Sequence, residues 1–209
     1  HPYARLEPPL AELPELALPP QLRAQVLALA TLPAIRIEPP ALALAGPDPG
    51  MHRAVCQALA AGAGMSLLTV DLPPLAERLG ATAAITISTR EAAFQEAILL
   101  LEGADQLTAE EQGAVRRALA DGSSAPLAVM GTKEAIYWPG LAVELPGLTF
   151  DAQRALWERE VGAEPGIEAP ALDAVAGRFA LSTEKVRDAA AAARGIARWR
   201  DPGNPVLQP

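Results

Sequence analysis

The feature that most constrains the fold is an alternation of short apolar runs with helical patterns across residues 41–147. Five runs have the length and apolar character of buried strands, at residues 41–45, 66–70, 97–101, 127–130 and 141–145. Between them, the spacing of Thr108 and Glu111 is that of a capping box and opens a helix to about Ala120. This alternation predicts an α/β fold with a parallel sheet flanked by helices and right-handed crossovers.

Other helices are expected from periodicity and from the positions of proline. Prolines are frequent in residues 1–40, which predicts a leader with a single helix at 22–31. A helix is expected from His52 to about Ala61, and residues 75–95 are mostly helical in pattern. The β-branched stretch at 85–89 leaves helix and strand both open at that point.

After Pro146 the pattern contains helices only. Asp151 can cap a helix that runs through Val161, and a second helix is expected at about 170–179. Ser182 can cap a third, in which Val186, Ala190, Ala193 and Ile196 follow helical spacing. We therefore expect a leader at 1–40, an α/β subdomain at 41–147, a small all-helical subdomain at 148–200 and a tail or linker at 201–209.

Composition excludes several classes of protein. The 209 residues carry a formal net charge of −8, which argues against a general nucleic-acid or anionic-membrane partner. One cysteine, Cys56, excludes an internal disulfide framework, and two histidines cannot build a histidine metal centre, so no metal site is predicted. No apolar run reaches the ~18 residues of a membrane span. We expect a cytoplasmic module of a longer protein, with Cys56 as a small core residue.

The first strand, loop and helix occupy the architecture of a phosphate-binding loop. The loop reads Gly46-Pro47-Asp48-Pro49-Gly50-Met51-His52-Arg53, against G-x-x-x-x-G-K-[ST] for an intact one. Gly46 fits the first glycine. Met51 stands at the second glycine, His52 at the lysine and Arg53 at the magnesium-binding hydroxyl. Without further support, a strand-to-helix turn rich in glycine is the simpler interpretation.

A second motif gives that support. The apolar run at 97–101 ends in Glu102-Gly103-Ala104-Asp105, and the chain here resembles the AAA+ ATPases, whose second motif is an apolar strand followed by Asp-Glu-Ala-Asp or similar. The resemblance puts Glu102 at the metal-coordinating aspartate and Gly103 at the catalytic glutamate, and Thr132 near the residue that senses the γ-phosphate.

The resemblance extends over about residues 41–198. Arg90-Glu91-Ala92 resembles the segment that precedes the second motif in some bacterial members. The last helices, with residues such as Arg154, Leu156, Trp157, Val186 and the segment 179–182, resemble the AAA+ helical lid. The whole is similar to the degenerate first module of bacterial tandem-module AAA+ proteins, including those that accompany contractile injection systems.

The departures from the family pattern predict a module without catalytic residues. Phosphoryl transfer depends on the lysine, Mg²⁺ and a positioned nucleophile. His52, with a reference pKa of ~6.5, is mostly neutral at pH 7, Arg53 repels a metal ion, and Gly103 cannot orient water. Loss of even one charge-stabilising group commonly costs on the order of 10²–10³ in rate. Lys133 and Arg154 are poor substitutes for an arginine finger.

Binding without turnover stays open at this point. The helix N-terminus near residue 51 favours phosphate and Arg53 offers a charge, whereas the bulk of Met51 opposes close approach. The vestigial nucleotide-binding candidates are Gly46, Gly50, Met51, His52, Arg53, Glu102, Asp105 and Thr132. Glu102 and Asp105 are equally consistent with capping or solvated acids.

Three functions are therefore weighed. The first is a non-hydrolysing module that supports an ATPase ring, with other AAA+ modules as partners in a hexamer-like assembly. The second is an ATPase that still binds or hydrolyses ATP, and the third is a protein-interaction adaptor on the same fold. No tightly bound cofactor is expected, although ATP or ADP with Mg²⁺ remains possible.

Overall fold

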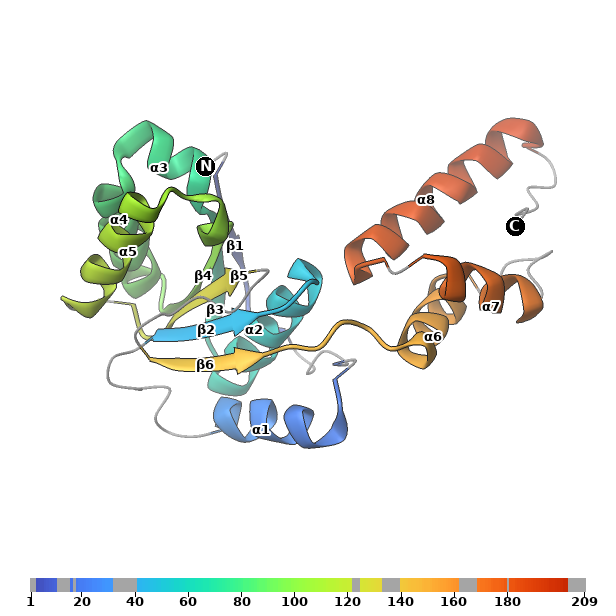
Figure 1. The fold of residues 1–209 in the computed structure, drawn as a ribbon, viewed down its shortest axis with the longest axis horizontal. Coiled ribbons are helices and arrows are strands. Elements are labelled where there is room, and N and C mark those ends of the chain that lie inside the picture. The colour runs from blue at the N-terminus through green and yellow to red at the C-terminus, as the bar shows by residue number, and fades with distance from the viewer. Residues whose placement is uncertain are drawn as a thin grey trace. The chain divides into compact units, whose positions relative to one another are not determined.

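The computed structural model describes residues 3–10, 16, 18–31, 41–121, 125–132, 140–161, 169–179 and 181–202. The chain divides into two compact units, residues 1–146 and 147–209, and each unit is described by itself. The first unit is built on a six-stranded sheet in the order β1-β3-β4-β5-β2-β6 (Figure 1). All neighbouring strands run parallel except β1, which runs antiparallel to β3. The α/β fold predicted from the sequence is confirmed.

The five predicted strands are present, with small shifts at their ends. They are β2 (Ala41–Ala45), β3 (Ser66–Asp71), β4 (Ala97–Glu102), β5 (Ala128–Thr132) and β6 (Leu141–Glu144). β2 and β5 are buried along their whole length, as central strands covered on both faces should be.

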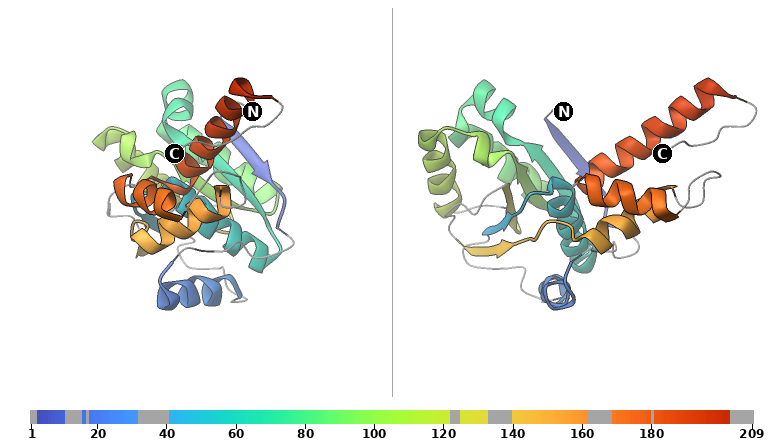
Figure 2. Two further views of the ribbon diagram at one scale, coloured as in Figure 1. Left: turned by 90° about the vertical axis from the view of Figure 1, so that its right-hand side faces the viewer. Right: turned by 45° about the vertical axis from the view of Figure 1, so that its right-hand side comes forward.

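Helices cover both faces of the sheet (Figures 1 and 2). α2 (Pro49–Ala63) packs on β3, β4 and β5, and α1 (Pro20–Thr31) packs on α2. The other face carries α4 (Ala81–Phe94), which contacts β4, α3 (Leu72–Leu79) and α5 (Ala109–Ala120). Ile85 of α4 and Val115 of α5 share a core there with Leu99 and Leu101 of β4. Since side chains alternate along a strand, Leu100 and Glu102 face α2.

Local sequence explains where these helices begin and end. The capping box of α5 is confirmed, because Thr108 and Glu111 exchange backbone and side-chain hydrogen bonds. The β-branched stretch at 85–89 is helical, because Ile85, Ser88 and Thr89 are buried within α4 and tertiary packing outweighs their β propensity. α2 begins at Pro49, three residues before the predicted start.

The first strand, β1 (Ala4–Glu7), was not predicted. It lies at the sheet edge with Ala4 opposite Val70 and Glu7 opposite Leu67. A four-residue strand followed by Pro8 and Pro9 carries little periodic signal, and only pairing with β3 defines it. The leader therefore contributes a strand to the α/β unit as well as the predicted helix α1.

The second unit consists of α6 (Phe150–Val161), α7 (Ala169–Arg178) and α8 (Thr183–Arg200). The three helices share one core that includes Leu156, Trp157, Leu172, Val186 and Ala190. The Ser182 side chain caps α8 by accepting a hydrogen bond from the Lys185 amide, as predicted. Most of the predicted tail at 201–209 lies outside the described residues. Of the helices that the structure describes, none combines the length and apolarity needed to span a bilayer.

Candidate functional site

The loop after β2 approaches another backbone segment closely. The amide of Gly46 donates a hydrogen bond to the carbonyl oxygen of Thr132 at 2.9 Å, at the end of β5. A β-carbon at Gly46 would lie 2.5 Å from the carbonyl oxygen of Leu145. Gly46 is therefore required by packing of the loop against the segment after β6, whatever the loop binds.

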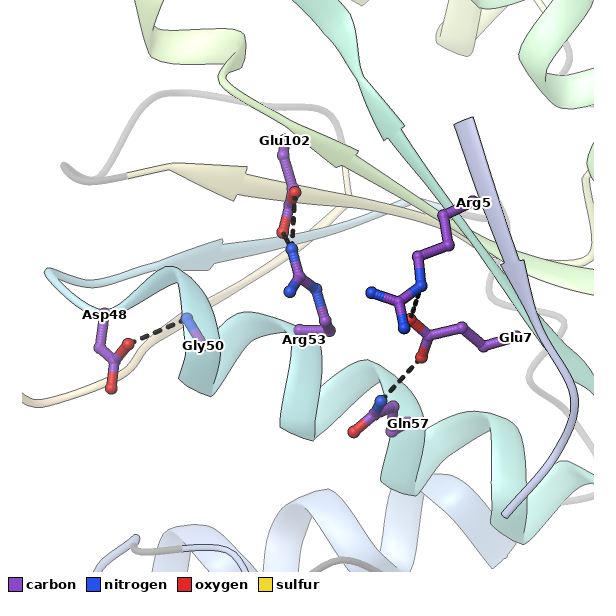
Figure 3. Close-up of polar contacts among 7 residues, drawn as sticks. All are labelled: Arg5, Glu7, Asp48, Gly50, Arg53, Gln57 and Glu102. Atoms are coloured by element: carbon purple, nitrogen blue, oxygen red, sulfur yellow. Dashed lines mark hydrogen bonds and ion pairs between the residues drawn. The ribbon is translucent and has the colours of Figure 1, made fainter. Parts of the chain in front are cut away.

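The first turn of α2 is capped by the protein itself. Asp48 is the N-cap residue, and its Oδ1 accepts a hydrogen bond from the Gly50 amide at 2.9 Å (Figure 3). Asp48 is 5% exposed, and Met51, in the first turn of α2, is also buried. A helix N-terminus attracts negative charge, and here the carboxylate of Asp48 supplies it.

His52, which the sequence pattern puts at the lysine position of a phosphate-binding loop, is buried against the sheet. It is 2% exposed, and a β-carbon on Gly131 of β5 would lie 3.1 Å from its Nδ1. Burial lowers the pKa of His52 below 6.5, while the charges of Asp48 and Asp105 oppose that shift. The imidazole is therefore neutral at pH 7, and its Nε2 has no hydrogen-bond partner among the described residues.

Arg53 and Glu102 form an ion pair across the end of the sheet. Nη2 of Arg53 lies 3.1 Å from Oε1 and 3.2 Å from Oε2 of Glu102 (Figure 3). The two side chains are 27% and 23% exposed. The two residues that the sequence resemblance puts at magnesium-ligand positions are thus a cation and an anion that bind each other.

The residues after β4 are held in a tight turn. Gly103 has a φ of +75°, in the left-handed region, and a β-carbon there would lie 2.9 Å from Cδ and Cγ of Pro73. Asp105 lies in the following 3₁₀ turn, Ala104–Gln106. A side chain at position 103 would therefore meet both backbone strain and a steric contact.

The fold brings most of the predicted residues to one edge of the sheet. Gly46 follows β2, Glu102 is the last residue of β4, and Thr132 is the last residue of β5. These strands are parallel, so their carboxyl ends lie at the same edge of the sheet. Thr132 is 2% exposed. Among the described residues, no group of three or more His, Cys, Asp or Glu side chains is placed to hold a metal ion.

Sequence reasoning missed the role of Asp48. The order Asp-Pro is itself a helix-start signal, because an N-cap aspartate commonly precedes proline at the first helical position. Reading that signal would have placed the start of α2 at Pro49 and identified a carboxylate on the first turn.

Comparison with solved structures identifies the fold. The chain is similar to a structure from work on the structural basis of katanin self-assembly, with a TM-score of 0.65 and 17% identity over 94% of this chain and 75% of that one. It is similar to the FIGL-1 AAA domain in complex with ADP, with a TM-score of 0.68 and 12% identity over 96% of this chain and 78% of that one. It is also similar to C. elegans PCH-2, with a TM-score of 0.62 and 11% identity over 98% of this chain and 71% of that one. The chain has the fold of an AAA+ ATPase domain, which confirms the resemblance at the level of the fold.

A family model matches the second unit. Residues 149–208 match the model described as the contractile injection system ATPase helical domain. No curated protein sequence gives a significant match to the chain.

Proposed function

We propose that this chain is an AAA+ module that does not hydrolyse ATP and that supports the ring of a larger, cytoplasmic ATPase structurally or allosterically. The observation that carries the proposal is the ion pair between Arg53 and Glu102. In an active site of this fold, a hydroxyl and a carboxylate at these positions hold Mg²⁺. Here a guanidinium already neutralises the carboxylate, so a metal ion would have to displace it.

The neighbouring groups support the same conclusion. His52 is neutral and packs on Gly131, so it supplies no positive charge for phosphate oxygens. The Asp48 carboxylate accepts the amide of Gly50 at the start of α2. A triphosphate approaching this turn would meet a buried negative charge in place of free amides.

A catalytic glutamate cannot be restored at position 103 by a single substitution. Gly103 adopts a left-handed conformation and lies against Pro73. A glutamate at 103 would require the turn after β4 to move. Taken together, the residues present do not fit a magnesium nucleotide, and no hydrolytic step is assigned to this chain.

The first test measures binding and turnover on the chain. Isothermal titration calorimetry with ATP and Mg²⁺ is expected to give no saturable heat at millimolar nucleotide, and a phosphate-release assay is expected to give no rate above the buffer blank. Magnesium-dependent turnover by the chain would contradict the proposal.

A variant designed to gain binding tests whether the ion pair between Arg53 and Glu102 prevents nucleotide binding. His52→Lys combined with Arg53→Thr restores the two phosphate-loop residues without touching Gly103. We expect this double variant to gain measurable ATP affinity. The matched control, Arg90→Thr on the exposed face of α4, removes the same charge elsewhere and is expected to leave binding absent.

The supporting role depends on a partner module. The match of residues 149–208 to a helical domain of contractile injection system ATPases supports a place in such an assembly. We expect the full-length gene product to contain an intact G-x-x-x-x-G-K-[ST] module and to form a ring by native mass spectrometry. A full-length product without a second AAA+ module would favour the adaptor function instead.

A further inference from the structure

A second polar site lies beside the ion pair, on the face of the sheet that α2 covers. Tyr3 and Arg5 of the N-terminal segment, Thr69 and Asp71 of β3, Glu102 of β4 and Arg53 of α2 line a cavity of about 280 Å³, here called the β1–α2 pocket. Arg5 is paired with Thr69 across the β1–β3 ladder, and Asp71 with Glu102 across the β3–β4 ladder. The period of two along each strand therefore places these side chains on one face.

The pocket contains polar groups that the protein leaves without partners. Thr69 is 7% exposed, and its Oγ1 is buried without a hydrogen-bond partner among the described residues. The carboxylate of Asp71 does not cap α3, and it forms no hydrogen bond or ion pair with any described residue. A buried hydroxyl without a partner costs free energy, so these two groups are an incomplete binding site for a donor.

The opposite wall of the pocket carries positive charge. Arg5 on β1 is held through its Nε by Oε1 of Glu7 at 3.0 Å, and Gln57 of α2 donates to the other oxygen of Glu7 at 2.8 Å. Figure 3 shows the side chain of Arg5 extending from β1 to Glu7, and that of Arg53 extending from α2 to Glu102. The terminal nitrogens of Arg5 are donors that suit a carboxylate.

The charges that line the pocket are balanced, which selects the class of ligand. Arg53 and Glu102 neutralise each other, which leaves Arg5 to repel a metal ion and Asp71 to repel an inorganic anion. A molecule with both charges meets a complementary group at each end. A volume of about 280 Å³ accommodates only a small ligand.

We propose that the β1–α2 pocket binds a small zwitterion of the amino-acid class, with its ammonium group at Asp71 and Thr69 and its carboxylate at Arg5. The strand β1 completes this pocket, so the leader forms part of a ligand site. The proposal does not depend on whether the chain hydrolyses ATP.

The test uses small probes that carry both charges, one charge or an inorganic anion. The ¹⁵N-labelled chain is titrated with 4-aminobutyrate and with glycine, two zwitterions of different length, and with butylamine, butyrate and phosphate. At least one zwitterion is expected to shift the amides of Thr69 and Asp71 with a dissociation constant of about millimolar order, as befits so small a ligand. Neither butylamine nor butyrate is expected to match it.

Substitutions inside and outside the pocket distinguish binding at this site from a general effect of charge on the protein. Asp71→Asn and Arg5→Gln, both at exposed positions, are each expected to weaken binding about tenfold. Thr69→Val is also expected to weaken it, with the amide spectrum reporting that the fold is kept. The controls Glu77→Gln and Arg90→Gln remove exposed charges outside the pocket and are expected to leave binding unchanged.

The proposal is overturned if neither zwitterion shifts Thr69 and Asp71 at 50 mM, or if butylamine or butyrate alone binds as well as the zwitterion. Binding of phosphate at these residues in preference to both zwitterions would overturn it too, since that would make the pocket an anion site.

Discussion

Arg53 donates to both carboxylate oxygens of Glu102, at 3.1 Å and 3.2 Å, although 49 residues separate them in the chain. The pair joins α2 to the end of β4. Under the proposed function, the same contact also occupies the positions of the magnesium ligands.

The ion pair is expected to make a modest contribution to stability. Both side chains keep about a quarter of their surface exposed, so solvent screens the attraction. In a double-mutant cycle with Arg53→Met and Glu102→Gln, urea unfolding is expected to give a coupling energy of about 1 kcal/mol. A coupling energy of zero would contradict the expected contribution of this pair to stability.

His52 is expected to make stability depend on pH. Because burial lowers its pKa in the folded protein, the unfolded chain binds a proton that the folded chain does not. The contribution is complete above about pH 6.5 and is lost as pH falls from there through the folded-state pKa, with a slope of at most about 1.4 kcal/mol per pH unit.

The control for this dependence is His52→Gln, which keeps a polar side chain but does not titrate. Urea unfolding at pH 7.5, 6.5 and 5.5 is expected to show a shallower slope for the variant than for the original chain. His1 is the only other histidine and is common to both proteins. Equal slopes would mean that His52 is not buried in its neutral form.

Gly103 and Gly64 provide a matched pair of left-handed glycines. At Gly64, with φ +67°, a β-carbon meets nothing within 4 Å, so Gly64→Ala is expected to cost about 1 kcal/mol of backbone strain. At Gly103 the same change adds the contact with Pro73, and we expect a loss of about 2–4 kcal/mol. Thermal and urea unfolding measure both, and equal losses would contradict the tight turn after β4.

Cys56 is expected to be inert in the folded protein. It is fully buried in α2, and burial together with the charge of Glu102 raises the pKa of its thiol, while Arg53 opposes the shift. Modification by a thiol reagent should require opening of the domain and proceed at least about 10³-fold more slowly in buffer than in 8 M urea.

A variant with the thiol on the surface of the same helix gives the control. Cys56→Ala combined with Ala63→Cys places the thiol at an exposed position near the end of α2. It should react at similar rates in buffer and in urea. Rapid modification of Cys56 itself in buffer would show that α2 is not packed as described.

The elements of the fold could be predicted because their signals are local. Apolar runs such as the one ending at Leu101 identify buried strands, and the pair Thr108 and Glu111 identifies a helix start from hydrogen bonds three residues apart. The order of elements along the chain placed Gly46 after the first predicted strand, Arg53 near the start of the next helix and Glu102 at the end of a strand, and the structure has them there.

What the sequence by itself determined is therefore the five apolar strands, the main helical segments, their order and the residue types at each motif. The tertiary structure decided the contacts between distant residues: Arg53 with Glu102, His52 with Gly131, and the antiparallel strand β1 beside β3. Pairing at a sheet edge and burial of a side chain depend on which surfaces meet, and no periodicity within a single segment records that. The same reason explains why Arg5 and Asp71 were brought into one pocket only by the fold.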